Sequence, residues 1–214
     1  MENIKQILKN RIFYYYFFLI VGAIWHITGL IQEIMSILSS FTIIIISLIS
    51  IFLFIKKETK NYLFVLLIFI LSFLAEYIGV KTGILFGNYS YSDELLIQIN
   101  NVPIAIGFAW LSTLFTSFSL TIKTKISGLF SIAGLNAFLM TLFDYFLEPA
   151  AIKLNYWQWN NVKVPIFNYA TWFLLSFIFS IITIKYIKRN EDISELKHLY
   201  FSQLIYFILI WLFV

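Results

Sequence analysis

The chain has no cysteine and few charged residues: Asp, Glu, Lys and Arg together make up 12% of its 214 positions. Without cysteine it can form no disulfide, no thiolate nucleophile and no metal site with Cys ligands. The scarcity of charge accompanies a content of 61% hydrophobic and 20% aromatic residues. That balance is typical of a helical bundle in a membrane rather than of a soluble domain. We therefore expect an all-α, polytopic transmembrane bundle that forms a single domain over residues 1–214.

Seven apolar segments are long enough to cross about 30 Å of hydrocarbon at about 1.5 Å per residue. They are Ile12–Ile31, Ile34–Ile55, Tyr62–Val80, Val102–Thr121, Ile126–Glu148, Ile166–Ile187 and Leu199–Val214. Two longer polar loops separate them, at residues 81–101 and 149–165. The sequence therefore predicts about seven spans, with the two polar loops on the same side of the membrane.

The basic residues predict which side that is. With seven spans, twelve of the 15 Lys and Arg residues fall on one side, and only Lys81, Lys153 and Lys163 fall on the other. The positive-inside rule then places the N-terminus in the cytoplasm and both polar loops outside. We interpret the basic residues behind the net charge of +4 as topology signals, so we expect no nucleic-acid partner. We expect the protein in a bacterial cytoplasmic membrane.

Three carboxylates lie within or at the rim of these apolar segments: Glu76, Asp144 and Glu148. A charged carboxylate at the centre of a bilayer costs roughly 2.5–3.5 kcal/mol, so such residues usually face a protein interior and serve a function. Asp144 and Glu148 are four residues apart, which places both on one face of a helix. Two such neighbours cannot both ionise cheaply, so one is expected to keep a proton. That acid could protonate a carbon–carbon double bond, and its ionised neighbour could activate water.

Further polar and aromatic residues should gather near the same side of the membrane. His26 lies on a stripe with Gly22 and Gly29 that should face neighbouring helices, where histidine serves either catalysis or a helix–helix hydrogen bond. Asn136 precedes Asp144 on the fifth span. Aromatic faces could shelter a cation, although Trp and Tyr are also enriched at membrane interfaces. The aromatic candidates are Tyr89, Tyr91, Trp110, Trp157, Trp159 and Trp172.

The two polar loops repeat one pattern. Each follows a glutamate and carries two aromatic residues at alternate positions, then Asn-Asn, then a proline at the start of the next span. The first unit runs from Glu76 to Pro103, and the second from Glu148 to Pro165. Because the distance from Glu to Pro differs, both an ancient duplication and chance remain open.

The same residues form an ordered set of motifs over about residues 76–172. The first part reads Glu76-Tyr77-x-Gly79-Val80-x-Thr82-Gly83-x-x-Phe86-Gly87-x-Tyr89-x-Tyr91, then Val102-Pro103 and Trp110. The second part reads Asp144-x-x-x-Glu148-Pro149, Trp157-x-Trp159, Val164-Pro165, Asn168 and Trp172. In these motifs the chain resembles the membrane-bound carotenoid-biosynthesis proteins that include the bisanhydrobacterioruberin and γ-carotene hydratases.

The resemblance implies a hydro-lyase that adds water to the terminal isopropylidene double bond of an acyclic carotenoid end group. It implies Asp144 and Glu148 as the acid and base, with Glu76 assisting and with Asn136 and Asn168 orienting their partners. The aromatic candidates would line the end-group pocket. No cofactor and no metal would be needed. The carotenoid would enter laterally from the lipid bilayer, and other enzymes of the pathway are possible partners.

Other functions share some of these features. A lycopene-type cyclase begins with the same protonation, so the sequence barely separates cyclisation from hydration. A prenyltransferase needs two aspartate-rich clusters to hold Mg²⁺, whereas this chain has the single Asp144/Glu148 pair. A retinal photoreceptor needs a lysine within the last span, and Leu199–Val214 has none. A proton-coupled transporter also uses carboxylates inside the membrane and remains an alternative.

Overall fold

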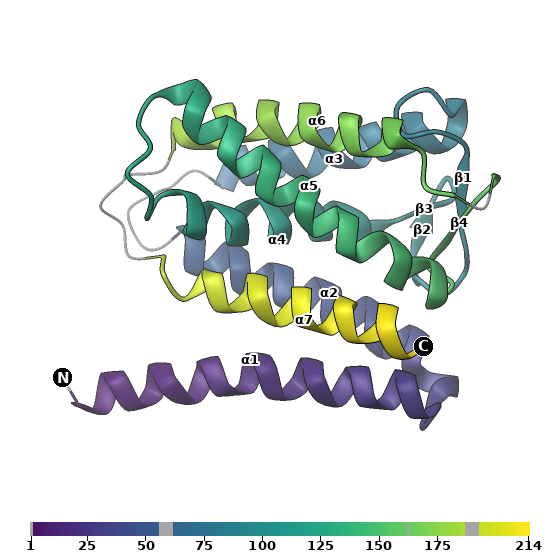
Figure 1. Cartoon of the computed structure of the whole chain (residues 1–214), viewed down its shortest axis with the longest axis horizontal. Coiled ribbons are helices and arrows are strands. Elements are labelled where there is room, and N and C mark those ends of the chain that lie inside the picture. The colour runs from purple at the N-terminus through teal and green to yellow at the C-terminus, as the bar shows by residue number, and fades with distance from the viewer. Residues whose placement is uncertain (1, 56–61, 162, 187–192) are drawn as a thin grey trace.

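The computed structural model describes residues 2–55, 62–161, 163–186 and 193–214, and seven helices dominate them (Figure 1). The helices are α1 (Glu2–Thr28), α2 (Gln32–Ile55), α3 (Tyr62–Thr82), α4 (Ile104–Thr121), α5 (Leu129–Lys153), α6 (Ile166–Ile184) and α7 (Leu196–Phe213). All seven are long and apolar enough to cross a membrane. The prediction of an all-α transmembrane bundle is confirmed.

Most helix ends differ from the predicted bounds by a few residues, and two of these differences affect the predicted site. The fifth span was expected to end at Glu148, but α5 continues through Pro149 to Lys153. A proline removes one backbone donor, and here the following Ala150 and Ala151 are fully buried, so packing outweighs that loss. Conversely, α1 ends at Thr28 and Gly29 adopts φ +69° in the turn to α2. The expected stripe of His26 with Gly29 on one helix is therefore wrong.

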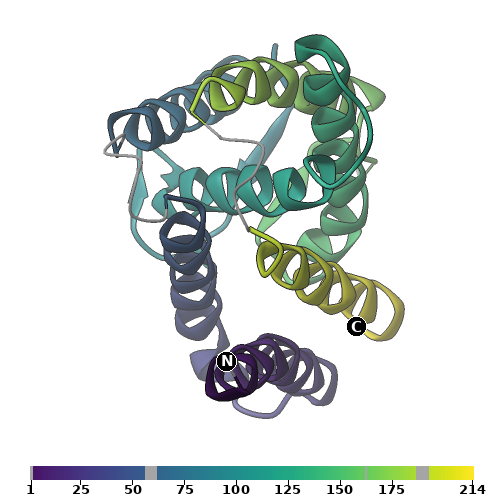
Figure 2. The same cartoon turned by 90° about the vertical axis from the view of Figure 1, so that its left-hand side faces the viewer.

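Helix α4 lies at the centre of the bundle, and α1 lies outermost (Figure 2). Large side chains of α4 such as Leu111, Phe115 and Phe118 have at most 1% of their surface exposed. The same helix buries many hydroxyls. Burying these hydroxyls costs little free energy, because each can donate to a carbonyl of the preceding turn. Thr113 donates to Ala109 at 2.9 Å, and Thr116 donates to Ser112 at 2.7 Å. Small polar residues thus let the neighbouring helices approach α4 closely.

Short strands join the two polar loops at one end of the bundle, which we call the strand end (Figure 1). Strand β1 (Tyr89–Tyr91) pairs antiparallel with β4 (Trp157–Trp159), so that Tyr89 faces Trp159 and Tyr91 faces Trp157. A second pair, β2 (Gln98–Ile99) and β3 (Val102–Pro103), forms a hairpin before α4. The prediction that both polar loops lie at the same end is confirmed, whereas the pairing between them was not foreseen.

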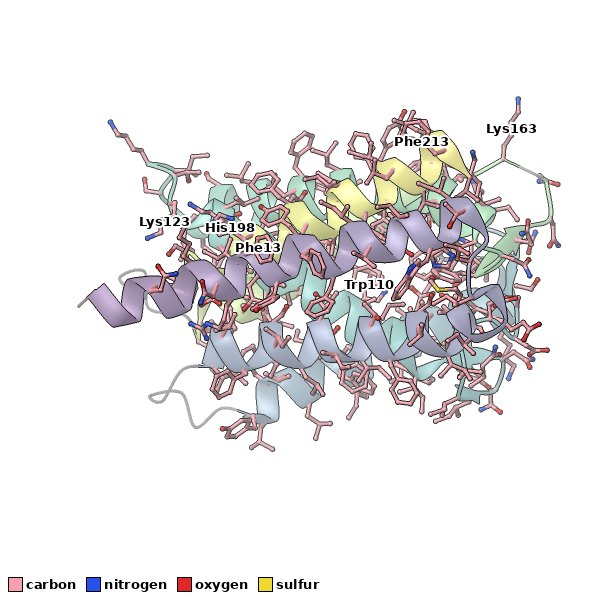
Figure 3. The ribbon with its side chains drawn as sticks, turned by 90° about the horizontal axis from the view of Figure 1, so that it is seen from below. Phe13, Trp110, Lys123, Lys163, His198 and Phe213 are labelled. Carbon is pink, nitrogen blue, oxygen red and sulfur yellow. The ribbon has the colours of Figure 1, made fainter. Side chains whose placement is uncertain are left out.

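The orientation in the membrane remains a prediction, and single cysteines can test it. Lys163 lies at the strand end and Lys123 at the opposite end (Figure 3), and both are exposed. We expect an impermeant thiol reagent to label Lys163→Cys from outside the cell and to label Lys123→Cys only after lysis, because the positive-inside rule places Lys123 in the cytoplasm. The cysteine-free chain gives no background. The opposite labelling pattern would invert the orientation. Five residues of this charge argument, Lys56, Lys57, Lys60, Lys188 and Arg189, lie outside the described residues.

Candidate functional site

A cavity of about 70 Å³ lies inside the bundle at the strand end, and we call it the acid pocket. All three intramembrane carboxylates line it, together with Asn168 from the first turn of α6. The predicted aromatic residues also line it: Tyr89, Tyr91, Trp110, Trp157, Trp159 and Trp172. The structure thus brings together, from α3, α4, α5, α6 and two loop strands, all of the predicted site residues except His26 and Asn136.

Glu148 is held by three N–H donors. Its Oε2 accepts from the indole nitrogens of Trp157 at 3.0 Å and Trp159 at 2.9 Å. Its Oε1 accepts from Nδ2 of Asn168 at 3.1 Å. Only 2% of its surface is exposed. Indole and amide N–H groups cannot accept in return, so this surrounding suits an ionised carboxylate, which is an acceptor only.

Glu76 has a closely similar surrounding. Its Oε2 accepts from the hydroxyls of Tyr89 at 2.6 Å and Tyr91 at 2.8 Å, and its Oε1 accepts from the indole of Trp110 at 2.8 Å. Burial, together with the adjacent Glu76 carboxylate, raises the pKa of both tyrosines well above the ordinary value. The two phenols therefore stay protonated and remain donors to Glu76.

Asp144 differs from both glutamates because one of its oxygens has no partner. Its Oδ2 accepts from Nδ2 of Asn168 at 2.9 Å, and the same amide nitrogen contacts Glu148. Its Oδ1 is buried and makes no hydrogen bond in the structure. A buried polar atom without a partner is costly, so this oxygen is the one that a substrate or water in the pocket could contact. Asp144 is thus the one of the three carboxylates with an oxygen that makes no hydrogen bond in the structure.

Aromatic rings form the walls of the acid pocket. Trp110 and Trp172 stack with centroids 3.7 Å apart and planes inclined by 11°. Tyr89 packs on Trp159 at 5.1 Å, and Tyr91 meets Trp157 edge to face at 5.8 Å. Five of these rings are held in place because their N–H or O–H groups donate to the glutamates, and Trp172 is held by its stack on Trp110. Such faces attract a cation through their quadrupoles.

The site has an approximate internal twofold symmetry. In each half, one oxygen of the glutamate accepts hydrogen bonds from two aromatic residues at alternate positions of the loop that follows it. The second oxygen of the glutamate accepts a hydrogen bond from a residue of the helix after that loop. Pro103 precedes Trp110 by seven residues, as Pro165 precedes Trp172, and the two tryptophans stack on each other. The antiparallel β1–β4 pair is what a twofold axis between the halves requires. These contacts favour duplication over chance.

Two predicted site residues lie elsewhere. His26 contacts Ser39 at 3.5 Å and the ring of Tyr206, and it lines other cavities beside α1. Asn136 donates to Ser180 at 2.9 Å and accepts from Thr121 at 3.2 Å, so it ties α4, α5 and α6 together outside the acid pocket. Among the residues that the structure describes, no three His, Asp or Glu side chains are grouped so as to hold a metal ion.

The pocket also contains residues that sequence reasoning missed. Ser47 and Gln203 bring polar groups from α2 and α7, and Tyr156 closes the pocket beside β4. Burial raises the pKa of Tyr156 to about 12, so its hydroxyl is neutral. A glutamine within the apolar last span was the one signal that could have pointed to Gln203.

Fold and site together define a class: an integral membrane protein of seven spans with an internal acidic pocket walled by aromatic rings. More specifically, the chain belongs to the carotenoid biosynthesis protein family, whose model matches residues 32–214. Membership implies a carotenoid substrate and an enzymatic role, and it confirms the family resemblance drawn from residues 76–172. The match begins at the start of α2, after α1. No curated protein and no solved structure matches the chain.

Proposed function

We propose that the protein is a carotenoid hydratase, which adds water to the terminal isopropylidene double bond of an acyclic end group. One observation carries the proposal: Asp144 Oδ1 is buried without a partner in a pocket whose two other carboxylates are each satisfied by three donors. Asp144 is therefore the proton donor. Glu148, one turn away and linked through Asn168, supplies the negative charge that keeps the proton on Asp144.

The first step is protonation of the double bond. The π electrons form a new C–H bond with the proton of Asp144, and the positive charge develops on the carbon that bears two methyl groups. The aromatic walls and the carboxylates of Glu76 and Glu148 stabilise that charge in a site of low dielectric. Because these groups are already fixed by their hydrogen bonds to one another, they need no reorganisation when the cation forms.

The second step is capture of the cation by water. A water oxygen forms the C–O bond, and one of its protons passes to the Asp144 carboxylate, so that the site regains the proton it gave. The overall change is alkene plus water to tertiary alcohol, with no oxidation or reduction. Ser47, Gln203 and Asn168 offer polar groups beside the pocket to an ordered water.

A neighbouring polar cavity supports a supply of water. It has a volume of about 300 Å³ and lies at the strand end, beside the ends of α1 and α5. We call it the polar vestibule, and its lining includes His26, Ser39, Glu94, Lys153 and Tyr156. Tyr156 also lines the acid pocket, so the two cavities lie on either side of this side chain. In this proposal His26 lines the water route rather than the reacting centre. A cyclase would instead need to exclude water from its cation.

Isotope labelling tests the proposal against cyclisation and transport. Purified protein should convert an acyclic carotenoid in ¹⁸O-labelled water to a tertiary alcohol that carries the label, because water captures the cation. Mass spectrometry of the product measures this directly. A cyclic isomer of unchanged mass would show that the protein is a cyclase, with the same protonation step. No conversion of any acyclic or monocyclic carotenoid, with proton-coupled uptake in vesicles, would show that it is a transporter.

A further inference from the structure

The largest of the cavities described here lies between α1, α2 and α7, and we call it the α1 groove. Its volume is about 510 Å³. Its lining is mainly apolar and includes Phe18, Leu19, Gly22, Ile45, Ile46 and Leu199. Along α1 the lining extends from Tyr14 to His26, a distance of roughly 18 Å at 1.5 Å per residue. A long, mainly apolar cavity of this kind suits an extended hydrocarbon chain.

The α1 groove adjoins the acid pocket. Ile43 from α2, Gln203 and Phe207 from α7, and Tyr156 line both cavities. These side chains form the boundary between the groove and the acid pocket. A chain that lies along α1 would reach the aromatic walls of the acid pocket past Gln203 and Phe207.

The α1 groove also opens to the lipid bilayer. Phe18 on α1 is 65% exposed and Ile45 on α2 is 53% exposed, although both line the groove. Helix α1 packs chiefly on α7 and has few contacts with α2. In Figure 3, viewed from the α1 side, the labelled Trp110 of the acid pocket is seen between α1 and α2. Because the exposed lining residues Phe18 and Ile45 belong to α1 and α2, we place the mouth of the groove between these two helices.

Helix α1 is fixed as a wall of the groove at the end opposite the strands. Glu195, at the start of α7, accepts from Arg11 at 3.0 Å and from Tyr15 at 2.6 Å. Nearby, the Tyr16 hydroxyl lies 3.2 Å from Nδ1 of His198. These contacts hold α1 against α7, while the side toward α2 stays open.

We propose that the α1 groove binds the isoprenoid chain of the same carotenoid molecule whose terminal double bond reaches Asp144. The proposal rests on the proposed function, since it is the acid pocket that identifies the occupant. The carotenoid enters from the bilayer between Phe18 and Ile45, lies along α1, and presents only its end group to the carboxylates. The α1 groove would then select for the length and straightness of the chain, and the acid pocket would select for the end group.

A substitution at Gly22 tests the proposal. A Cβ atom added there meets only Tyr206 at 3.8 Å, an ordinary contact, and Gly22 lines the groove, so we expect the ring of Gly22→Phe to occupy it. We expect kcat/KM for a full-length acyclic carotenoid to fall at least about tenfold, mainly through KM. For a short acyclic isoprenoid with the same terminal double bond, kcat/KM should stay near the wild-type value, because such a substrate does not extend into the groove. Ile46→Phe narrows the groove from α2 and should give the same pattern.

The matched control is Ile24→Phe, which adds the same ring on the lipid-facing side of α1, where Ile24 is 48% exposed. It should behave as the wild type. Equal losses for long and short substrates, or no loss for either, would overturn the proposal. Binding is measured separately, as carotenoid retained through purification and read from its absorbance, so it needs no turnover. If wild type and Gly22→Phe retain carotenoid equally, with phospholipid recovered from the groove, the groove is a lipid site and the proposal is wrong.

Discussion

Replacing Asp144 with asparagine should lower turnover by about a hundredfold or more, the usual cost of losing a general acid. Asparagine keeps the size of the side chain and can still accept from Asn168, which now donates to Asp144 Oδ2 at 2.9 Å. What it lacks is a proton that can be given to the substrate. KM should change little, because the aromatic walls and the α1 groove are untouched. The measurement is steady-state turnover at equal amounts of folded protein.

Ser72 provides a matched control for this substitution. It precedes Glu76 by four residues, as Asp144 precedes Glu148, so it occupies the equivalent position in the other half of the site. Its hydroxyl donates to the carbonyl of Phe69 at 3.0 Å on its own helix, and it does not line the acid pocket. Ser72→Ala should therefore keep near-normal turnover. Near-normal turnover in Asp144→Asn as well would remove Asp144 from the mechanism.

The helices and the carboxylates could be predicted from the sequence because their signals are local. A run of apolar residues long enough to cross a bilayer predicts a span regardless of its neighbours. A carboxylate in such a run stands out because burying it alone is costly. The helix ends were predicted less well: α5 passes through Pro149, since the burial of Ala150 and Ala151 decides the outcome and depends on residues far away in sequence.

The contacts that complete the site could not be predicted, because each joins distant segments. Strands β1 and β4 have three residues each, too few for a periodic pattern, and their register is set by the helices that carry them. The stack of Trp110 on Trp172 likewise depends on how α4 and α6 meet. His26 was a reasonable candidate on polarity alone, but polarity does not show which of several neighbouring cavities a helix faces.

The two halves of the site are related by an approximate twofold symmetry, but they differ in two respects. Both glutamates accept three hydrogen bonds, but only Glu148 has an acidic neighbour one turn earlier. The donors also differ in kind. Tyrosine hydroxyls at Glu76 can rotate and accept a hydrogen bond, whereas the indoles at Glu148 can only donate. The two glutamates should therefore respond differently to the same substitution.

Glu148→Gln should lower turnover about a hundredfold, and Glu76→Gln should lower it only severalfold. At position 76 the new amide group can donate to Tyr89 and Tyr91 while its oxygen still accepts from Trp110, so the contacts survive. At position 148 the amide oxygen must face Trp157 and Trp159, which leaves the NH₂ group against the NH₂ of Asn168. Asn168 must then turn, and it withdraws its donor from Asp144.

Comparing the two variants under identical conditions separates a local role from general damage to the site. Both remove one buried negative charge near the cation, so the difference between them measures the link through Asn168 to Asp144. Asn168→Leu offers a check, since it removes the shared donor without adding a charge, and it should resemble Glu148→Gln in turnover rather than Glu76→Gln. Equal losses at both glutamates would mean that their charge alone matters. A larger loss in Glu76→Gln would contradict the role given to Asp144. It would mean that the reaction takes place beside Glu76 rather than beside Glu148 and Asp144.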